Sequence, residues 1–316
     1  MNQKKDLNPW WRLKGWFIYH AMIRALRDRL GLTKARVLYS AGGALSPQII
    51  RFFLALGIEI RLLYGSTETG IISIPRPGDI QPETSGKPMP WTDVKISEEG
   101  EIRVKSKYLF AGYYKNPEAK AKKIKDGYYC TDDFGYIDDN GYLIVIDRME
   151  DLKELSDGGK FSPQYCEVRL RFSPYIRDVL VVGGDREFVT ALINIDLDNV
   201  GRYAESNHIA YTTFTDLSQK LPVIDLVKDE IRKVNRTLPS HARIQRFVNM
   251  HKEFDADEAE MTRTRKLRRN FVEERYRDVI SALYGDEDVI AVEAPITYRG
   301  GRKGTISTSI HINTVK

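Results

Sequence analysis

Cysteine is scarce in this chain of 316 residues. Only Cys130 and Cys166 are present, which is too few for a disulfide framework and gives no paired CxxC zinc spacing. The five histidines are scattered without the spacing of metal ligands. This composition is typical of proteins from a reducing compartment, so we predict a cytoplasmic location.

Long apolar runs are also missing, and the first thirty residues mix Trp and Phe with Arg and Lys. That mixture excludes a signal peptide and a membrane-spanning helix in this segment. Apolar residues recur at three- and four-residue steps from Trp16 to Leu30, which predicts an amphipathic helix. Such a helix can lie on a membrane surface, here the inner membrane face, or pack on a domain. Both alternatives stay open.

Charge of one sign is not in large excess. Lys and Arg number 49 against 44 Asp and Glu, which leaves +5. Five cations gather in TRTRKLRR, from Thr262 to Arg269, but no aromatic residue lies between them to stack on bases. A solvated helix face accounts for most of this run, so we predict no nucleic-acid partner.

With 42% apolar and 29% charged residues, the chain can fold as two domains, and disorder is excluded. Near the N-terminus, Val37–Tyr39 predicts a buried strand and Ile58–Leu63 a second strand. Ser46 as N-cap and Gly57 as C-terminal stop bound a helix between them. Strand, helix and strand in this order predict a parallel sheet in an α/β layer.

Proline and glycine concentrate after Ile74, and short alternating strands follow. We therefore predict a small β subdomain at about 76–147, which completes a first domain at 1–147. A charged joint, Asp147–Lys160, leads into an α+β domain at 148–316. The β subdomain is expected to contain strands at 101–105 and 142–146. The α+β domain is expected to contain strands at 179–182 and 192–197, helices at 223–234 and 271–283, and a hairpin that turns at Gly300-Gly301.

Four segments carry residue types that suit a nucleotide site. YGSTETG, Tyr64–Gly70, offers an aromatic ring to stack on a base, hydroxyls for phosphate oxygens, and the Glu68 carboxylate for Mg²⁺. AGGA, at 41–44, would let a planar base approach the backbone. In TDDFG, Asp133 can accept hydrogen bonds from both ribose hydroxyls, and in DRMED, Arg148 supplies a fixed fork of donors.

Together with neighbouring motifs, these segments resemble the AMP-forming adenylating superfamily of acyl-CoA synthetases, luciferases and nonribosomal adenylation domains. The resemblance lies in AGGALSP, YGSTETG, GEIRVKSKYLFAGYYKNPE, YYCTDDFGYIDDNGY and DRMEDL. Within the superfamily, KFSPQYCE, RFSPYIRDVLVVGG, ALINIDLDNVGRYAE and MTRTRKLRRNFVEERY are similar to the long-chain fatty acyl-CoA synthetases. The implied fold is part of the large adenylate-forming domain, with a parallel sheet layer and a β subdomain, followed by a mobile α+β lid.

The resemblance implies ATP, Mg²⁺, CoA and a fatty acid as reactants and cofactors. A fatty acid carboxylate would attack the α-phosphate of ATP, and the CoA thiol would then displace AMP. Tyr64 would stack on adenine, with Gly42, Gly43 and Ala44 along its other side, and Gly65 and Ser66 beside the nucleotide. Thr67 would contact phosphate and Glu68 would hold Mg²⁺. Asp133 and Arg148 would hold the ribose.

The remaining roles fall in the second domain. Lys266 would neutralise the carboxylate and the α-phosphate in the first step. Glu150 would be the hinge about which the lid rotates, and Gly158, Gly159 and Lys160 would then face CoA.

The chain departs from the family pattern in three places. The phosphate-binding loop and the first half of the large domain have no counterpart, so we expect a C-terminal half: an expressed fragment, a split-gene piece or a truncated product. An incomplete sheet exposes apolar edges, which predicts self-association or a need for the missing half. Asp132 replaces a usual glycine, adding negative charge and tightening the turn, and Glu150 replaces Asp or Lys.

Two alternatives remain open at this point. One is another acid-activating enzyme, for example one that transfers the acyl group to a carrier protein. The other is a non-catalytic nucleotide-binding fragment, which the absent phosphate loop favours.

Overall fold

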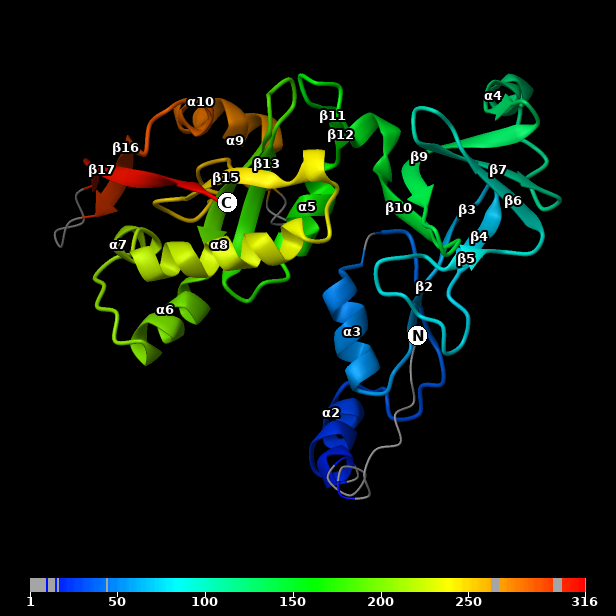
Figure 1. Cartoon of the computed structure of the whole chain (residues 1–316), viewed down its shortest axis with the longest axis horizontal. Helices are drawn as coiled ribbons and strands as arrows, with labels where there is room; N and C mark the ends of the chain where they lie inside the picture. The colour runs from blue at the N-terminus through cyan, green and yellow to red at the C-terminus, as the bar shows by residue number, and fades with distance from the viewer. Residues whose placement is uncertain are drawn as a thin grey trace. The chain divides into compact units, whose positions relative to one another are not determined.

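The computed structural model describes residues 10, 15, 17–43, 45–262, 267–297 and 303–315. At 294–297 and 303–306 it describes the backbone alone. The chain forms two compact units, Met1–Val145 and Ile146–Lys316 (Figure 1). A functional boundary between residues 147 and 148 remains a prediction.

The first unit contains the predicted parallel layer. Strands β1 (Leu38–Ser40) and β2 (Ile60–Leu62) pair in parallel, and α3 (Pro47–Ala55) connects them. The Ser46 hydroxyl accepts a hydrogen bond from the Gln48 amide at 3.3 Å, and Gly57 ends the helix with φ +74°. The predicted strand–helix–strand arrangement is therefore confirmed.

The prediction that the first strand is buried is wrong. Tyr39 is 57% exposed and Val37 is 39% exposed. Parallel strands are usually covered on both faces, and the two-stranded sheet of the described chain offers too little neighbouring structure to cover β1.

The predicted N-terminal helix is represented by a π-helical turn, η1 (Tyr19–Ile23), and by α2 (Arg24–Arg29). Its apolar side is uncovered, since Phe17 and Met22 are each about two-thirds exposed. Among the described residues, no helix is both long and apolar enough to cross a bilayer.

Antiparallel β structure occupies the rest of the first unit. It begins at Tyr64, ahead of the expected start at about residue 76, because the YGSTETG segment itself folds into a hairpin. Strands β3 (Tyr64–Ser66), β4 (Gly70–Ile74) and β5 (Lys87–Pro88) form one sheet. A second sheet has the order β10-β9-β7-β6, with β8 beside β9. Its strands are β6 (Thr92–Ile96), β7 (Glu101–Ser106), β8 (Ile124–Lys125), β9 (Tyr128–Ile137) and β10 (Leu143–Arg148), and α4 (Pro117–Lys122) precedes β8.

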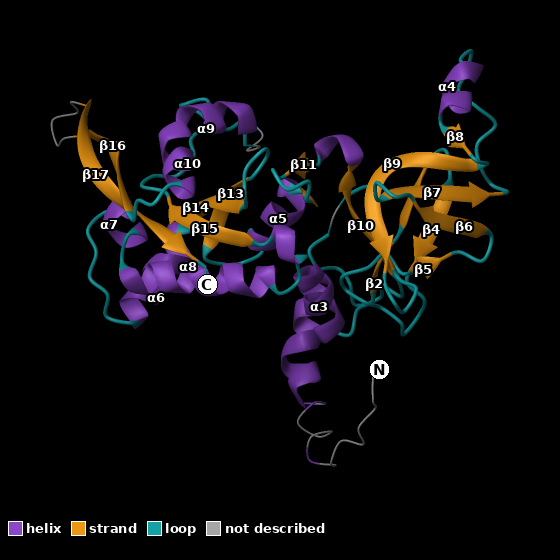
Figure 2. Cartoon of the chain, turned by 45° about the horizontal axis from the view of Figure 1, so that its top comes forward, coloured by secondary structure: helices purple, strands orange, loops and turns teal. Residues whose placement is uncertain are grey.

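The second unit is the predicted α+β fold, built on a mixed sheet of order β13-β14-β15-β17-β16. Helices α5 to α8 cover one face of this sheet, and α9 and α10 cover the other (Figure 2). Strands are β13 (Ile176–Val182), β14 (Val189–Ile195), β15 (Ile244–Asn249), β16 (Val289–Thr297) and β17 (Lys303–Thr314). Helices are α5 (Pro163–Leu170), α6 (Leu197–Ser206), α7 (Phe214–Ser218), α8 (Leu221–Asn235), α9 (Arg269–Arg275) and α10 (Arg277–Tyr284). Two short 3₁₀ turns, η2 (Met149–Asp151) and η3 (Ser240–Ala242), and the hairpin β11 (Lys153–Glu154) with β12 (Lys160–Phe161) complete the unit.

Two element boundaries differ from prediction. The helix expected at 271–283 is divided at Tyr276, whose backbone leaves the helical region with ψ +26° while its buried hydroxyl donates to Glu260. The strand expected to reach Leu197 ends at Ile195, because the Asp196 side chain accepts from the Asn199 amide and caps α6. The hairpin of β16 and β17 is confirmed, whereas its Gly300-Gly301 turn lies outside the described residues.

Candidate functional site

The hairpin of β3 and β4 presents Thr67 and Glu68 in its turn. Gly65 must be glycine, because a Cβ there would lie 2.1 Å from the carbonyl oxygen of Gly70. The Ser66 amide donates to the hydroxyl of Thr69 at 3.1 Å, and Thr69 is buried. These contacts fix the backbone of the turn whose Thr67 and Glu68 are predicted, from the family motif, to contact phosphate and to bind Mg²⁺.

Two of the predicted nucleotide-binding residues meet directly. The Tyr64 hydroxyl donates to Oδ2 of Asp133 at 2.6 Å, across 69 positions of sequence. Asp133 lies on β9, where its amide donates to the Thr131 hydroxyl at 3.1 Å, and that hydroxyl donates to the Ile102 carbonyl at 2.7 Å. The fold therefore brings the expected adenine and ribose residues into contact.

Glu68 has a partner that sequence reasoning missed. The Tyr113 hydroxyl donates to Oε1 of Glu68 at 2.9 Å and lies 3.3 Å from the Tyr129 hydroxyl. The Phe110 amide donates to the Glu68 carbonyl at 2.8 Å. Burial, followed by the hydrogen bond with Tyr113, raises the pKa of Tyr129. Tyr113 lies in the motif GEIRVKSKYLFAGYYKNPE. Membership of that motif is the one sequence feature that could have indicated a role for Tyr113.

The surroundings of Glu68 fit a magnesium ion that is shared with a nucleotide. Within the described chain, no group of three His, Cys, Asp or Glu side chains could hold a metal. Mg²⁺ commonly takes one or two carboxylates and fills its other positions with substrate phosphates and water. One held carboxylate in a hydroxyl-rich turn meets that requirement.

The Asp132 departure is partly offset in the structure. Asp132 has φ +58°, a conformation that glycine adopts without cost. Its carboxylate forms an ion pair with Lys123. The extra negative charge expected beside the phosphates is therefore balanced by a cation.

The glycines of the AGGA segment stand in open surroundings. Gly42 has φ +78°, and a Cβ on Gly42 or Gly43 would meet no atom within 4 Å. No described atom of this chain covers the backbone there, and its role beside a base stays a prediction. Ala44 lies outside the described residues.

In the second unit, Arg148 ends β10 and Glu150 lies in the η2 turn, and both side chains are exposed. The Arg148 amide donates to Oδ1 of Asp147 at 2.9 Å. The Asp147 carboxylate also accepts from the hydroxyl of Ser162, the N-cap of α5. The expected hinge segment is thus tied at one side to a helix of the second unit.

Gly158 and Gly159 lie in the turn of the β11–β12 hairpin, and Lys160 begins β12. Gly158 has φ +88°, and the Leu155 amide donates to the Gly159 carbonyl at 2.8 Å. Nε2 of His241 lies 2.9 Å from the Lys160 carbonyl oxygen. A Cβ on Gly159 would lie 3.3 Å from Cβ of His241, so the hairpin and the η3 turn are closely packed.

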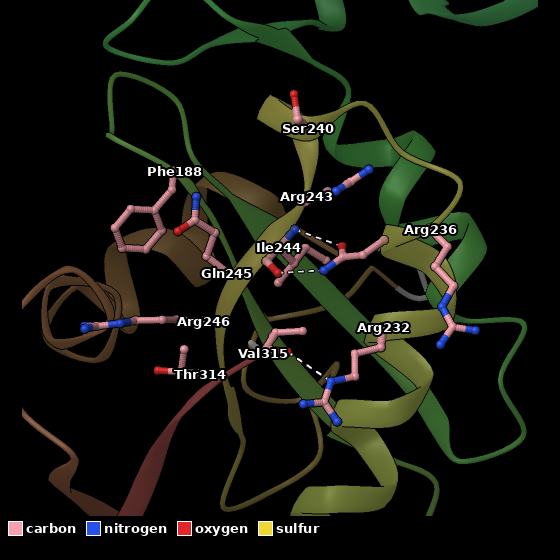
Figure 3. A pocket seen from close by; sticks show the side chains of 11 residues that line it. Phe188, Arg232, Arg236, Ser240, Arg243, Ile244, Gln245, Arg246, Thr314 and Val315 are labelled. Carbon is pink, nitrogen blue, oxygen red and sulfur yellow. Dashed lines mark hydrogen bonds between the residues drawn. The ribbon is translucent and has the colours of Figure 1, made fainter.

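An arginine-lined groove of about 820 Å³ lies beside that turn (Figure 3). Sequence reasoning did not find it, because its residues are spaced irregularly and gather only in the fold. No acidic residue is among the described lining residues, and the Phe188 ring stands at one side. Ser240, next to His241, is part of the wall. Its cations are Arg232, Arg236, Arg243 and Arg246.

Backbone carbonyls hold three of these arginines in place. Arg232 Nε donates to the Val315 carbonyl at 3.1 Å, Arg243 Nε to Leu238 at 3.2 Å, and Arg246 Nη1 to Leu283 at 3.3 Å. These acceptors orient the guanidinium groups and carry no net charge, although Arg232 also pairs with the carboxylate of Asp229 at 3.2 Å. The groove is therefore suited to a phosphorylated ligand.

Lys266 lies outside the described residues, as do the other residues at 263–266. The two cysteines are buried, and burial raises the pKa of Cys130 and brings that of Cys166 to about 12. Both thiols are protonated at neutral pH, so neither is an activated nucleophile.

Comparison with known families gives two matches. Residues 16–114 match the AMP-binding enzyme family, and residues 150–288 match the AMP-binding enzyme C-terminal domain. A long-chain-fatty-acid–CoA ligase of Mycobacterium bovis is 30% identical, over 84% of this chain and 44% of that protein. A long-chain-fatty-acid–CoA ligase of Drosophila melanogaster is 26% identical, over 83% of this chain and 45% of the relative. The chain thus spans less than half the length of these curated relatives.

Solved structures show the same fold. Apo MatB from Rhodopseudomonas palustris superposes with a TM-score of 0.57 at 21% identity, covering 83% of this chain and 50% of that one. The adenylation domain of a carboxylate reductase from Mycobacterium chelonae gives 0.54 at 24% identity, covering 83% and 41%. With both domain families matched in order and the fold shared, the chain belongs to the AMP-forming adenylating superfamily, the AMP-binding enzymes.

Proposed function

We propose that this chain is part of an AMP-forming long-chain fatty acid:CoA ligase. The observation that carries the proposal is the hydrogen bond between Tyr64 and Asp133, beside the hairpin turn that holds Glu68. A base-stacking ring, a ribose-binding carboxylate and a phosphate-side turn are then supplied by one unit. The names of the Mycobacterium bovis and Drosophila melanogaster relatives support the long-chain acid as substrate.

The proposed reaction has two steps. A fatty acid carboxylate oxygen attacks the α-phosphate of ATP, the bond to pyrophosphate breaks, and an acyl-adenylate forms. The CoA thiol, having lost its proton, then attacks the acyl carbonyl, and AMP leaves with the electron pair. Activation is needed because a free carboxylate is a poor electrophile toward a thiol.

On the nucleotide side, the Tyr64 ring would stack on one face of adenine. Gly42, Gly43 and Ala44 would lie along the other face of the base. Asp133 would accept from the ribose hydroxyls, with Arg148 as a further donor. Thr67, Gly65 and Ser66 would lie along the phosphates. Mg²⁺, when bound by Glu68, supplies positive charge to the phosphate oxygens.

Replacement of Tyr113 by phenylalanine tests how Glu68 is held. Loss of the hydroxyl removes one hydrogen bond that orients the Glu68 carboxylate, and we expect Mn²⁺ binding in the presence of ATP to weaken by about three- to tenfold, the value of one hydrogen bond. Electron paramagnetic resonance of free Mn²⁺ measures this directly. Tyr114→Phe is the matched control, because Tyr114 is 88% exposed. Equal affinities in the two variants would contradict the role of Tyr113.

On the CoA side, the arginine-lined groove and the Gly158–Lys160 hairpin would form one surface, joined through His241 and Ser240. CoA carries several phosphate groups, and the groove offers oriented guanidinium donors. We therefore expect this surface to bind the phosphorylated end of CoA, with Gly158, Gly159 and Lys160 nearest its chain.

The groove gives a second prediction. Arg232→Ala with Arg243→Ala should weaken CoA binding by about 10- to 100-fold, because each charge-assisted hydrogen bond contributes about 1.5–3 kcal/mol and neighbouring effects overlap. Calorimetric titration with CoA is the measurement, and Arg177→Ala, whose arginine pairs with Glu253 away from the groove, is the control. An unchanged Kd for CoA would remove the groove from the site.

A second acid-activating function, acyl transfer to a carrier protein, is distinguished by the acceptor. Given preformed acyl-adenylate, a CoA ligase should release AMP with CoA and not with a carrier-protein thiol. The reverse preference would favour transfer to a carrier protein. Nucleotide binding without turnover would favour a non-catalytic fragment.

We also propose a partner for the first unit. Phe17, Met22 and Tyr39 are exposed, and β1 has few neighbours. A polypeptide that supplies the remainder of a large adenylating domain would cover them, with self-association as the alternative.

We also propose a cytoplasmic location with contact at the inner membrane face. Liposome flotation of the chain with and without residues 16–30 tests this contact.

A further inference from the structure

The loop that follows β7 carries Tyr113, whose hydroxyl donates to the Glu68 carboxylate. This loop covers residues 107–116 and leads directly into α4. Residues 111–116 are all exposed. An exposed loop with few buried contacts opens easily, so Tyr113 stays beside Glu68 only if other contacts hold the loop.

Phe110 joins the loop to the hairpin that carries Glu68. Its amide donates to the Glu68 carbonyl at 2.8 Å. Its ring packs edge-on against the rings of Tyr113 and Tyr129, with centroids 4.8 and 5.8 Å away. Edge-to-face pairs of this kind are favourable and directional. Phe110 thus contacts both the Glu68 backbone and the ring whose hydroxyl reaches the Glu68 carboxylate.

Lys120 of α4 holds Phe110 in turn. Its Nζ donates to the Phe110 carbonyl at 2.8 Å and to the Ala111 carbonyl at 3.1 Å. The same ammonium stands 5.3 Å from the centroid of the Phe110 ring. Hydrogen bonds from a charged donor are stronger than those between neutral groups, and a cation over an aromatic ring adds attraction. One half-buried ammonium therefore fixes two successive peptide groups and a ring.

A tight turn brings Lys120 back to the loop. The Asn116 amide donates to the Tyr113 carbonyl at 3.1 Å. The Asn116 side chain accepts from the Ala119 amide at 3.1 Å and caps α4. Because the helix starts directly beside Tyr113, its first turn places Lys120 within reach of the Phe110 carbonyl.

We propose that Lys120 is a positioning residue for Glu68 in magnesium binding, an inference that rests on the proposed function. Lys120 acts at one remove. Its ammonium holds Phe110, and the same loop carries the Tyr113 hydroxyl that orients the carboxylate. A metal ligand binds most tightly when supporting hydrogen bonds keep it in its productive geometry.

Lys120→Met is the test variant, because methionine keeps an unbranched stem and removes the three N–H donors. Lys122→Met is the matched control, since Lys122 is an exposed lysine of the same helix. We expect Lys120→Met to weaken Mn²⁺ binding in the presence of ATP by about three- to tenfold, the effect of freeing one orienting hydrogen bond. Electron paramagnetic resonance of free Mn²⁺ measures this loss.

AMP binding separates positioning from general damage to the fold. Tyr64 and Asp133 meet between β3 and β9, so Lys120→Met should leave the Kd for AMP within about twofold of its original value. Equal weakening of Mn²⁺ and AMP binding, or unchanged binding of both, would overturn the positioning role.

A double variant tests whether Lys120 acts through Tyr113. Once the Tyr113 hydroxyl is absent, a looser loop has little further effect on the carboxylate. Lys120→Met combined with Tyr113→Phe should therefore bind Mn²⁺ within about twofold of the weaker single variant. Losses that multiply would show two independent contributions and would contradict the proposal.

Amide exchange tests the inference without a nucleotide. The Phe110 amide donates to the Glu68 carbonyl, so its exchange reports whether the loop stays on the hairpin. Exchange should accelerate at least about threefold in Lys120→Met and not in Lys122→Met. Identical exchange rates overturn the proposal even where no Mn²⁺ binds. Faster exchange in Lys120→Met, together with absent Mn²⁺ binding in the unmodified protein, counts against the proposed function alone.

Discussion

Replacement of Lys266 by alanine is expected to reduce adenylate formation by about 10²- to 10³-fold, the usual loss when a fixed charge is removed from a developing anion. Negative charge accumulates where the carboxylate meets the α-phosphate, and Lys266 is the cation that the family motif places there. In the second step the acyl-adenylate is already formed, and AMP is the leaving group. Thioester formation from supplied acyl-adenylate should therefore be spared.

Single-turnover assays of each half-reaction separate these outcomes. Lys233→Ala is the control, because Lys233 is an exposed lysine of α8 that pairs with Glu230. Loss of both half-reactions to the same degree would show that Lys266 supports the fold or a shared step.

Replacement of Asp133 by alanine is expected to weaken AMP binding by about 10- to 100-fold. A carboxylate that accepts from two ribose hydroxyls contributes about 1.5–3 kcal/mol, and its loss also leaves the Tyr64 hydroxyl without its 2.6 Å acceptor. Tyr64→Phe keeps the ring for stacking and removes the hydroxyl that makes this hydrogen bond, so we expect AMP binding to weaken by about two- to fivefold. The larger effect thus belongs to the carboxylate.

Equilibrium dialysis with labelled AMP measures both variants. Asp139→Ala is the control, since Asp139 is an exposed carboxylate of the same segment. Similar Kd values for Asp133→Ala and Asp139→Ala would exclude Asp133 from the nucleotide site, and the proposed function would lose the observation that carries it.

Local signals predicted the elements that frame the site. Ser46 caps α3 and Gly57 ends it. Both could be predicted, because a helix cap and a left-handed stop depend only on residues that are neighbours in the sequence. Motif order placed Tyr64 and Asp133 in one site, and the structure adds the hydrogen bond between them. For Lys266 and Ala44 the structure gives no description, so their roles rest on the motif.

Features made by tertiary contact were not predicted. The exposure of Tyr39 depends on how many strands neighbour β1, which periodicity does not encode. Tyr113 meets Glu68 across 45 positions, and the arginine-lined groove joins α8 with β15 and the end of β17. The break at Tyr276 follows the same pattern, because its hydroxyl is held by the buried Glu260.

Release of AMP from MgATP in the presence of palmitate and CoA tests the central claim most directly. The 316-residue chain should be measured alone and mixed with the upstream half of a related synthetase. The account predicts AMP release that requires both the acid and CoA, and that appears or rises sharply when the upstream half is added. Binding of ATP or AMP with no release in either arrangement would contradict the ligase assignment and favour a non-catalytic nucleotide-binding fragment.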